Sequence, residues 1–201
     1  MTYDLVIFDL GGVVVDVDSD GLINQVAQLV GKSFEEVHQV VYHHELLLPF
    51  ELGRITPHAY YEGLKARLPV PWTYEQFVRA WNNLFTENVD VTRLMQRLRH
   101  RHKLVALSNT NLLHITHIRQ NFPSLSVFHE WIASSDVGMR KPEPEIYQLA
   151  VRRGGTRAEQ AIYVDDRPEL VEAGCHVGLK GIRFESSQQL EEELLALGVN
   201  V

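Results

Sequence analysis

Residues 5–12 read LVIFDLGG, an apolar run that ends in the carboxylate of Asp9 and is followed closely by Gly11 and Gly12. A short apolar run bounded by glycine is typical of a strand that is buried on both faces. In an open α/β sheet, ligands bind beyond the carboxyl ends of such strands. We therefore predict that residues 5–8 form a central parallel strand and that Asp9 is a candidate nucleophile at the edge of the sheet.

Reactive side chains also follow later strand-like runs of the sequence. Ser108, Asp165 and Asp166 each come at the end of a short apolar run, and Lys141 lies in a polar loop. The carboxyl ends of parallel strands meet at one edge of a sheet. We therefore expect these residues to converge with Asp9 on a single site.

The pattern of the chain outside residues 16–87 places these runs in an α/β fold. Strand-like segments alternate with helix-like segments at the spacing of crossover connections, which predicts a doubly wound, Rossmann-like parallel sheet with helices on both faces. The expected strands are residues 5–8, 104–107, 131–135, 161–164 and 181–184, and expected helices begin near residues 91, 112 and 143.

Residues 16–87 differ from the rest because they show helical periodicity and no convincing β run. Ser33, Thr56 and Thr73 are N-cap candidates for helices in this segment. Apolar residues recur at helical spacing in residues 22–30, 34–41, 57–68 and 73–85. We predict a four-helix cap at 16–87, inserted into an α/β core domain formed by residues 1–15 and 88–201.

Composition narrows the class of protein. The 201 residues are 45% hydrophobic and 22% charged, as expected for a globular fold with a full core. A net charge of -7 argues against general attraction to nucleic acid or to anionic membranes. The only cysteine is Cys175, which excludes an internal disulfide. No basic segment precedes the first apolar run, which breaks at Asp9, and no stretch approaches membrane-spanning length, so we predict a cytoplasmic protein. We expect a monomer or homodimer without nucleic-acid or membrane partners.

Four stretches of the sequence resemble, in order and spacing, the motifs of the haloacid dehalogenase superfamily. These stretches are FDLGGVVVD from Phe8, LSNTN from Leu107, SDVGMRKPEPEIY from Ser135 and VDD from Val164. The resemblance covers essentially the whole chain, with a helical cap of the C1 type between the first and second motifs. The α-D-glucose-1-phosphate phosphatases are the subgroup that the sequence resembles most. The resemblance implies a hydrolase that acts on phosphoric monoesters.

The resemblance also implies magnesium chemistry at the carboxylates. Asp9 would attack phosphorus and form an aspartyl phosphate, and Gly11 would offer its main-chain carbonyl to Mg²⁺. Mg²⁺ prefers carboxylate oxygens, so we expect Asp166 to bind the metal directly and Asp165 to act through water or from behind the first ligands. Without a cation, three neighbouring carboxylates are not expected to ionise together.

The other two motifs supply groups for the phosphoryl oxygens. By resemblance, the Ser108 hydroxyl binds a phosphoryl oxygen with the help of the Asn109 amide, and Lys141 neutralises charge on the nucleophile and the phosphoryl group. Ser108 could also be the N-cap of the following helix. An ion pair with Asp136 is expected to orient Lys141.

Gly11 departs from the family pattern, since most phosphatases of this family carry an aspartate two residues after the nucleophile. That aspartate protonates the leaving alcohol, and the loss of a general acid costs about 10²–10⁴ in rate. The leaving hydroxyl of an anomeric phosphate is more acidic than an ordinary alcohol, which favours a sugar 1-phosphate as substrate. Asp16, Asp18, a cap histidine, a water or a substrate hydroxyl could instead carry the proton.

Some further polar residues have weaker signals. Glu51 and Arg54 flank a glycine turn and are candidate substrate contacts. The histidine pairs at positions 43–44 and 114–117 lack further zinc ligands nearby, and the acidic residues at 16–20 lack the glutamate that completes a calcium loop. We interpret them as ordinary surface or core residues.

The sequence therefore predicts a Mg²⁺-dependent phosphatase of a small phosphorylated metabolite such as a sugar phosphate. Two alternatives stay open. A 2-haloacid dehalogenase uses an equivalent aspartate to attack carbon and needs neither an acid nor a metal. A non-catalytic regulatory protein would bind phosphate without turnover.

Overall fold

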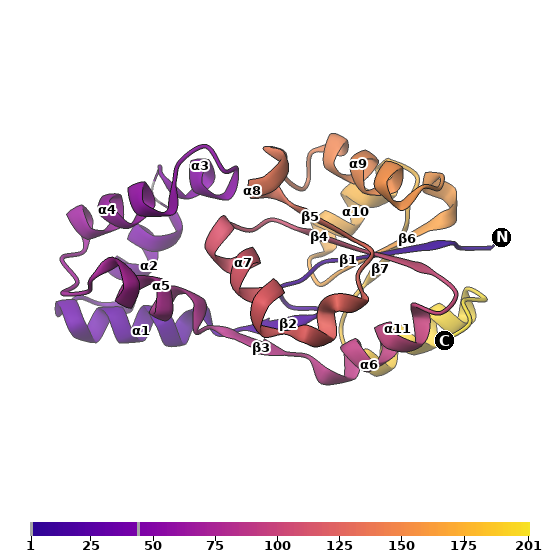
Figure 1. Cartoon of the computed structure of the whole chain (residues 1–201), viewed down its shortest axis with the longest axis horizontal. Helices are drawn as coiled ribbons and strands as arrows, with labels where there is room; N and C mark the ends of the chain where they lie inside the picture. Colours follow the sequence, from indigo (N-terminus) through magenta and orange to yellow (C-terminus); the bar gives the residue numbers. More distant parts are fainter. Residues whose placement is uncertain (1, 44) are drawn as a thin grey trace.

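The computed structural model describes residues 2–43 and 45–201 and contains a five-stranded parallel sheet in the order β5-β4-β1-β6-β7 (Figure 1). Neighbouring strands pair in parallel throughout this sheet. The predicted doubly wound α/β fold is confirmed. The strands are β1 (Leu5–Phe8), β4 (Lys103–Ser108), β5 (Glu130–Ala133), β6 (Ala161–Asp165) and β7 (Lys180–Arg183).

Helices cover both faces of the sheet. Successive residues of a strand point to opposite faces, so Val6 and Phe8 join one hydrophobic cluster while Leu5 and Ile7 join another. The first cluster includes side chains of α6 (Val89–Leu98), α7 (Leu112–Asn121) and α11 (Ser187–Ala196). On the opposite face lie α9 (Pro144–Gly154) and α10 (Pro168–His176). Burial on both faces explains the continuous apolar run of β1.

The register of the central strands brings their carboxyl ends together. Phe8 of β1 pairs with Ala106 of β4 and with Val164 of β6. Asp9, the residue after β1, donates its main-chain N–H to the carbonyl of Val164 at 2.9 Å. The ends of β1, β4 and β6 therefore lie side by side, as the parallel topology predicts.

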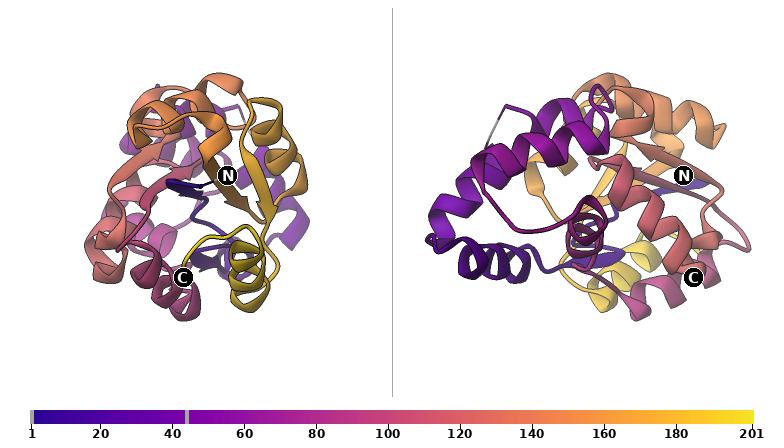
Figure 2. Two further views of the ribbon diagram at one scale, coloured as in Figure 1. Left: turned by 90° about the vertical axis from the view of Figure 1, so that its right-hand side faces the viewer. Right: turned by 60° about the vertical axis from the view of Figure 1, so that its left-hand side comes forward.

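A group of helices at one end of the molecule packs around a hydrophobic cluster of its own (Figure 2). These helices are α1 (Ser19–Val30), α2 (Phe34–His43), α3 (Leu47–Glu51), α4 (Pro57–Arg67) and α5 (Tyr74–Asn82). The described residues thus hold five helices here instead of the four predicted. The additional one is α3, whose five residues are too few to show a helical period in sequence.

The N-cap predictions for this segment are confirmed. The side-chain oxygens of Ser33, Thr56 and Thr73 each accept the main-chain N–H three residues later, at the starts of α2, α4 and α5. Thr73 also forms a complete capping box with Gln76. Such caps satisfy main-chain donors that have no partner within the helix.

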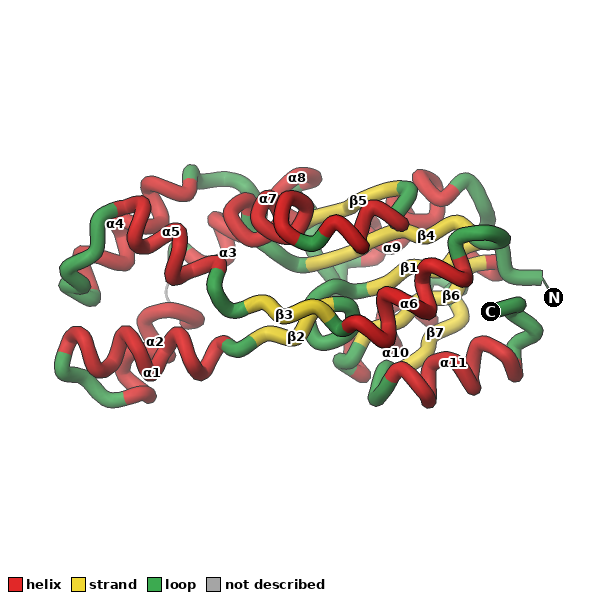
Figure 3. The backbone as a smooth tube through the Cα atoms, turned by 60° about the horizontal axis from the view of Figure 1, so that its bottom comes forward, coloured by secondary structure: helices red, strands yellow, loops and turns green. Residues whose placement is uncertain are grey.

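Two short strands connect this group of helices to the sheet. Figure 3 shows β2 (Val15–Val17) and β3 (Phe85–Glu87) running between them as an antiparallel pair. The Asp18 N–H donates to the Leu84 carbonyl at 2.8 Å and extends the pairing by one step. The prediction of no β structure between residues 16 and 86 is therefore wrong, because strands of three residues are too short to show alternation.

Smaller differences concern the ends of elements. β5 stops at Ala133, where residues up to 135 were predicted, and Ser134 begins the short helix α8 (Ser134–Val137). Short 3-10 helices at Pro123–Val127 and Ala158–Gln160 precede β5 and β6. No helix in the part of the chain that the structure describes combines the length and the apolar character needed to cross a bilayer.

Candidate active site

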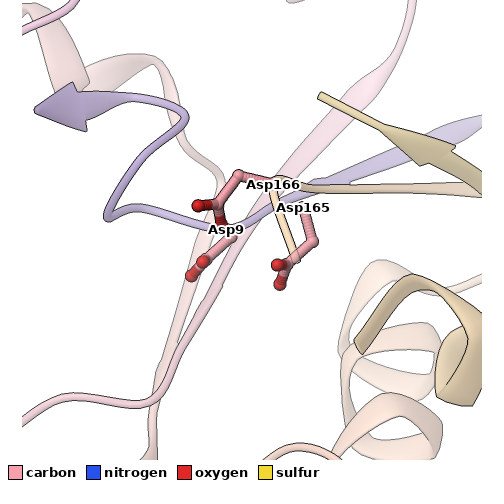
Figure 4. Close-up of side chains that lie close together, drawn as sticks. All are labelled: Asp9, Asp165 and Asp166. Carbon is pink, nitrogen blue, oxygen red and sulfur yellow. The ribbon is translucent and has the colours of Figure 1, made fainter. Parts of the chain in front are cut away.

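Three carboxylates gather at the carboxyl ends of β1 and β6. Asp9, Asp165 and Asp166 each place one oxygen so that these atoms lie within 4.8 Å of one another (Figure 4). Asp9 and Asp165 are buried and Asp166 is half-buried. Hard oxygen ligands in this arrangement suit Mg²⁺. It is the only such group of acidic, histidine or cysteine ligands among the side chains that the structure describes, residues 2–42 and 45–201.

Lys141 lies between two of these carboxylates. Its Nζ atom is 2.9 Å from Oδ1 of Asp9 and 2.6 Å from Oδ2 of Asp165, and its side chain is only 1% exposed. A buried charge needs such partners, because desolvation is otherwise too costly. The expected ion pair with Asp136 is wrong, since Asp136 pairs with Arg119 at 3.3 Å.

The main chain of Lys141 is held by the side chain of Asn109. Asn109 Nδ2 donates to the Lys141 carbonyl, and Asn109 Oδ1 accepts the Lys141 N–H, both at 2.8 Å. Both polar ends of this side chain are therefore engaged in positioning the lysine. Because the side-chain amide is engaged with Lys141, the predicted contact with a phosphoryl oxygen would come from the main-chain N–H of Asn109. This contact stays a prediction.

Asp165 is fixed from several directions. Its Oδ2 accepts hydrogen bonds from Lys141 Nζ and from the hydroxyl of Tyr163, and its Oδ1 accepts the Arg167 N–H at 2.9 Å. With both oxygens engaged, Asp165 is suited to hold Lys141 and to support the metal site from behind. Asp166 keeps the role of expected direct ligand. The part played by Tyr163 was not predicted, since a tyrosine in a buried strand gives no signal beyond core packing.

The glycine pair after Asp9 lets the chain turn close to the carboxylates. Gly12 has a φ of 77°, and a Cβ atom there would lie 2.6 Å from a carboxylate oxygen of Asp166. Only glycine adopts this conformation readily and leaves room for that side chain. Gly11 lines the site as well. That the Gly11 carbonyl binds a metal stays a prediction.

Ser108 ends β4 and is 5% exposed. It lines the same cavity as Asp9 and Lys141. The alternative role as N-cap of α7 is wrong, because Asn111 caps that helix by accepting the N–H groups of Leu113 and His114, both at 3.1 Å. The Ser108 hydroxyl therefore lies at the site and does not cap α7.

The electrostatics of the site favour a cation. Burial raises the pKa of Asp9 to about 6, although the nearby Lys141 lowers it and the Asp165 charge raises it further. Burial and the Asp165 charge also raise the pKa of Asp166. These directions agree with the expectation that the carboxylates do not ionise together without a metal.

The site opens into two adjoining cavities. One of about 510 Å³ is lined by Asp9, Ser108, Lys141 and Asp166, with Asp16 at its side. The second, of about 180 Å³, shares Gly11, Val17, Ser108 and Asn109 with the first. Its other side is formed by residues of the helical segment, including Tyr42, Leu47, Glu51 and Trp81. Both cavities therefore meet at the carboxyl end of the sheet.

Several residues noted in the sequence lie outside this arrangement. Asp18 caps α1 by accepting the Gly21 N–H at 2.9 Å, and no calcium loop forms there. The pair His114 and His117 does not belong to a metal-ligand group among the described residues. The pair at 43–44 lies outside the described residues and side chains.

Comparison with known families fits this geometry. The family model for haloacid dehalogenase-like hydrolases matches residues 3–178. The chain belongs to this family. The predicted superfamily and the prediction of a hydrolase are thereby confirmed, whereas the glucose-1-phosphate subgroup stays a prediction.

Relatives within the family include named phosphatases. The chain is 24% identical over 204 residues to D-ribitol-5-phosphate phosphatase of Bacteroides thetaiotaomicron, covering 96% of this chain and 97% of the relative. Flavin mononucleotide hydrolase 1 of Arabidopsis thaliana is 37% identical over 78 residues, which are 38% of this chain and only 32% of the plant protein. These names agree with the prediction of a phosphatase.

A solved structure shows the same fold. A haloacid dehalogenase family enzyme of Bacteroides thetaiotaomicron, in complex with magnesium and inorganic phosphate, superimposes with a TM-score of 0.82 at 23% identity. The match covers 91% of this chain and 94% of that chain. The likeness establishes the fold, including the helices that lie between the first strand and the rest of the sheet.

Proposed function

We propose that this protein is a Mg²⁺-dependent phosphatase that hydrolyses a small phosphomonoester through an aspartyl phosphate on Asp9. The observation that carries the proposal is the contact of Lys141 Nζ with both Asp9 and Asp165, next to the half-buried Asp166. A lysine that touches the nucleophile can offset the charge of an incoming phosphoryl group, which suits phosphoryl transfer. The expected substrate is a sugar phosphate, and a sugar 1-phosphate is favoured.

The donor set fits Mg²⁺. Asp9 and Asp166 offer carboxylate oxygens and Gly11 a main-chain carbonyl, and a bound dication would stabilise the ionised forms of two acids whose pKa values burial raises. Bound there, the metal would orient the phosphoryl group and stabilise the charge that develops on its oxygens. Asp165 is expected to support these ligands from behind.

Each residue of the site has a role in the proposed reaction. An oxygen of Asp9 attacks phosphorus in line with the leaving oxygen, and the bond to the leaving group breaks. Lys141 and the Ser108 hydroxyl hold phosphoryl oxygens, while Asn109 keeps the lysine in place through its main chain. Attack of water on phosphorus then releases phosphate and regenerates the Asp9 carboxylate.

The size of the second cavity supports a small leaving group. A cavity of about 150 Å³ accepts a molecule the size of benzene, so the cavity of about 180 Å³ suits a short sugar or polyol. Trp81 lines this cavity, and its indole N–H is buried with no hydrogen-bond partner among the described residues.

A phosphate-release screen tests the proposal. Purified protein is incubated with phosphorylated metabolites, including sugar 1-phosphates and terminal sugar phosphates, with Mg²⁺ or with EDTA. We expect release only with Mg²⁺, and higher turnover on anomeric and aryl phosphates than on primary alkyl phosphates. Equal turnover across these leaving groups would contradict the preference for a sugar 1-phosphate.

Asp9→Asn is the decisive variant because it removes the nucleophile and changes the side-chain shape little. Asp136→Asn is the matched control, since Asp136 pairs with Arg119 on the surface. Activity that survives Asp9→Asn would contradict the mechanism. Chelator-insensitive halide release from 2-haloacids would instead establish a dehalogenase, and Mg²⁺-dependent phosphate binding without release would establish a binding protein.

A further inference from the structure

The second cavity adjoins the one lined by Asp9 and reaches the helical segment, so we assign it to the leaving group of the proposed reaction. In an in-line displacement the leaving oxygen points away from the attacking oxygen, so it points away from Asp9. The cavity of about 180 Å³ begins at Gly11 and Ser108 and extends to Tyr42, Glu51 and Trp81 of the helical segment. A group that protonates the leaving oxygen should therefore line this cavity.

Most candidate proton donors are excluded by their contacts. Asp18 caps α1 and lines neither cavity. His114 accepts a hydrogen bond from Asn111 at Nδ1 and donates from Nε2 to the Trp81 carbonyl at 3.0 Å, which defines a neutral ring with both nitrogens engaged. Burial lowers the pKa of His114 to about 3, so it holds no second proton near neutral pH.

The remaining groups from the helical segment are few. Burial raises the pKa of Tyr42 above its already high ordinary value, so its hydroxyl is a poor proton donor near neutral pH. His38 and His58 line neither cavity. Among the described residues of the two cavities, Glu51 and Asp16 are then the carboxyl groups outside the metal-binding set. Asp16 is exposed on β2 and borders only the first cavity.

Glu51 is held in place at the end of α3. Its main-chain carbonyl accepts the Ser134 hydroxyl at 2.7 Å, and the nearby Gly53 lies so close to the Ser135 carbonyl that a Cβ atom would stand 2.2 Å from it. These contacts seat α3 against α8 of the sheet domain. The main chain at Glu51 is therefore held against the sheet domain, and Glu51 lines the second cavity.

The surroundings of Glu51 suit a group that both gives and takes a proton. Its side chain is 21% exposed, and burial raises its pKa, whereas the charges of Arg140 and Arg167 lower it. The Arg140 guanidinium lies 3.5 Å from a Glu51 oxygen, and Tyr42 is its neighbour in the cavity. A general acid works best when its pKa lies near the working pH.

We propose that the Glu51 carboxyl group is the general acid and base that Gly11 cannot supply. In the first step an Asp9 oxygen bonds to phosphorus, the bond from phosphorus to the leaving oxygen breaks, and Glu51 gives its proton to that oxygen to form an alcohol. In the second step water bonds to phosphorus and passes a proton to Glu51, and the bond from phosphorus to Asp9 breaks. The inference rests on the proposed phosphatase function.

Glu51→Gln tests this role through the acidity of the leaving group. The values of kcat/KM are measured for 2,4-dinitrophenyl, 4-nitrophenyl and phenyl phosphate and for one sugar phosphate. A good leaving group departs without a proton, so the variant should match the wild type on 2,4-dinitrophenyl phosphate. On the sugar phosphate it should lose about 10²–10⁴. Retained turnover of the dinitrophenyl ester also shows that the variant is folded.

Three further variants make the outcome decisive. Glu62→Gln changes an exposed glutamate on α4 and should behave as the wild type on every ester. Glu51→Asp keeps an acid and should recover part of the rate that Glu51→Gln loses on phenyl phosphate. Asp16→Asn should not steepen the dependence on the leaving group, and a steep dependence in this variant alone would assign the acid to Asp16 and overturn the proposal.

The results also separate this inference from the proposed function. A uniform loss across the series, or no loss, in Glu51→Gln would overturn the role of Glu51 while hydrolysis still required Asp9. Hydrolysis of the same esters by Asp9→Asn would instead overturn the aspartyl phosphate mechanism. Each result thus bears on one of the two carboxyl groups.

Discussion

Asp9→Asn should stabilise the metal-free protein at neutral pH. In the folded protein the pKa of Asp9 is about 6, compared with an ordinary value of 3.8. This interval is about 2 pH units, and each unit corresponds to about 1.4 kcal/mol, so the ionised carboxylate costs about 3 kcal/mol of folding free energy. Asparagine resembles the neutral acid and avoids that cost.

The sign follows from the raised pKa. The protonated form of Asp9 contributes its full stability below pH 3.8, and this contribution is lost as the pH rises through about 6. The stability difference between Asp9→Asn and the wild type should therefore be small near pH 4 and reach about 3 kcal/mol above pH 7. For a chain of this length that difference raises Tm by about 6–12 °C.

Thermal unfolding in EDTA, followed by circular dichroism from pH 4 to pH 8, measures this difference. The raised pKa of Asp166 is present in both proteins, so the comparison isolates Asp9. Mg²⁺ should stabilise the wild type more than the variant, because the variant lacks one carboxylate ligand. A variant that is no more stable than the wild type at pH 7.5, with a difference that does not change with pH, would refute the reasoning.

Further predictions concern the lysine, the glycine turn and the contact between the helical segment and α7. Lys141→Met should abolish turnover and cost about 3–5 kcal/mol in urea unfolding, because it leaves two buried carboxylates unpaired. Gly12→Ala should cost about 1–2 kcal/mol and weaken Mg²⁺ binding measured by calorimetry, because of its positive φ and its approach to Asp166. Normal Mg²⁺ affinity in this variant would contradict the crowding argument. His114→Gln should leave the pH profile of kcat/KM between pH 5 and 9 unchanged in shape, since the pKa of His114 is about 3; a lost inflection would contradict this.

The sequence was sufficient for the parts of the site that lie on the central strands. The apolar run before Asp9 and the one before Asp165 each predicted a buried parallel strand, and the parallel topology placed their ends together. This succeeds because a strand buried on both faces shows in the sequence as a continuous apolar run. Lys141 contacts the carboxylates of Asp9 and Asp165. This agrees with the expectation drawn from the SDVGMRKPEPEIY stretch, which contains the lysine.

Contacts between side chains far apart in the chain could not be predicted in this way. Asn109 reads as a polar residue before a helix, and its hold on the main chain of Lys141 depends on a loop 32 positions later. Tyr163 reads as core, although its hydroxyl binds Asp165. The charge of Asp136 suggested a partner for the lysine, but the fold brings Arg119 closer. Such pairings depend on tertiary geometry and leave no periodic pattern in the local sequence.

The paired strands β2 and β3 have an evolutionary consequence. The chain leaves and re-enters the sheet domain at neighbouring points, between Val17 and Asp18 and between Leu84 and Phe85, and one hydrogen bond closes this junction. A helical segment of another length could be grafted there without shifting the register around β1. Diversification of what is recognised can therefore proceed on one side of the junction while Asp9 and the clustered carboxylates on the other side are inherited intact, whereas a proton donor placed like Glu51 would change with the helical segment.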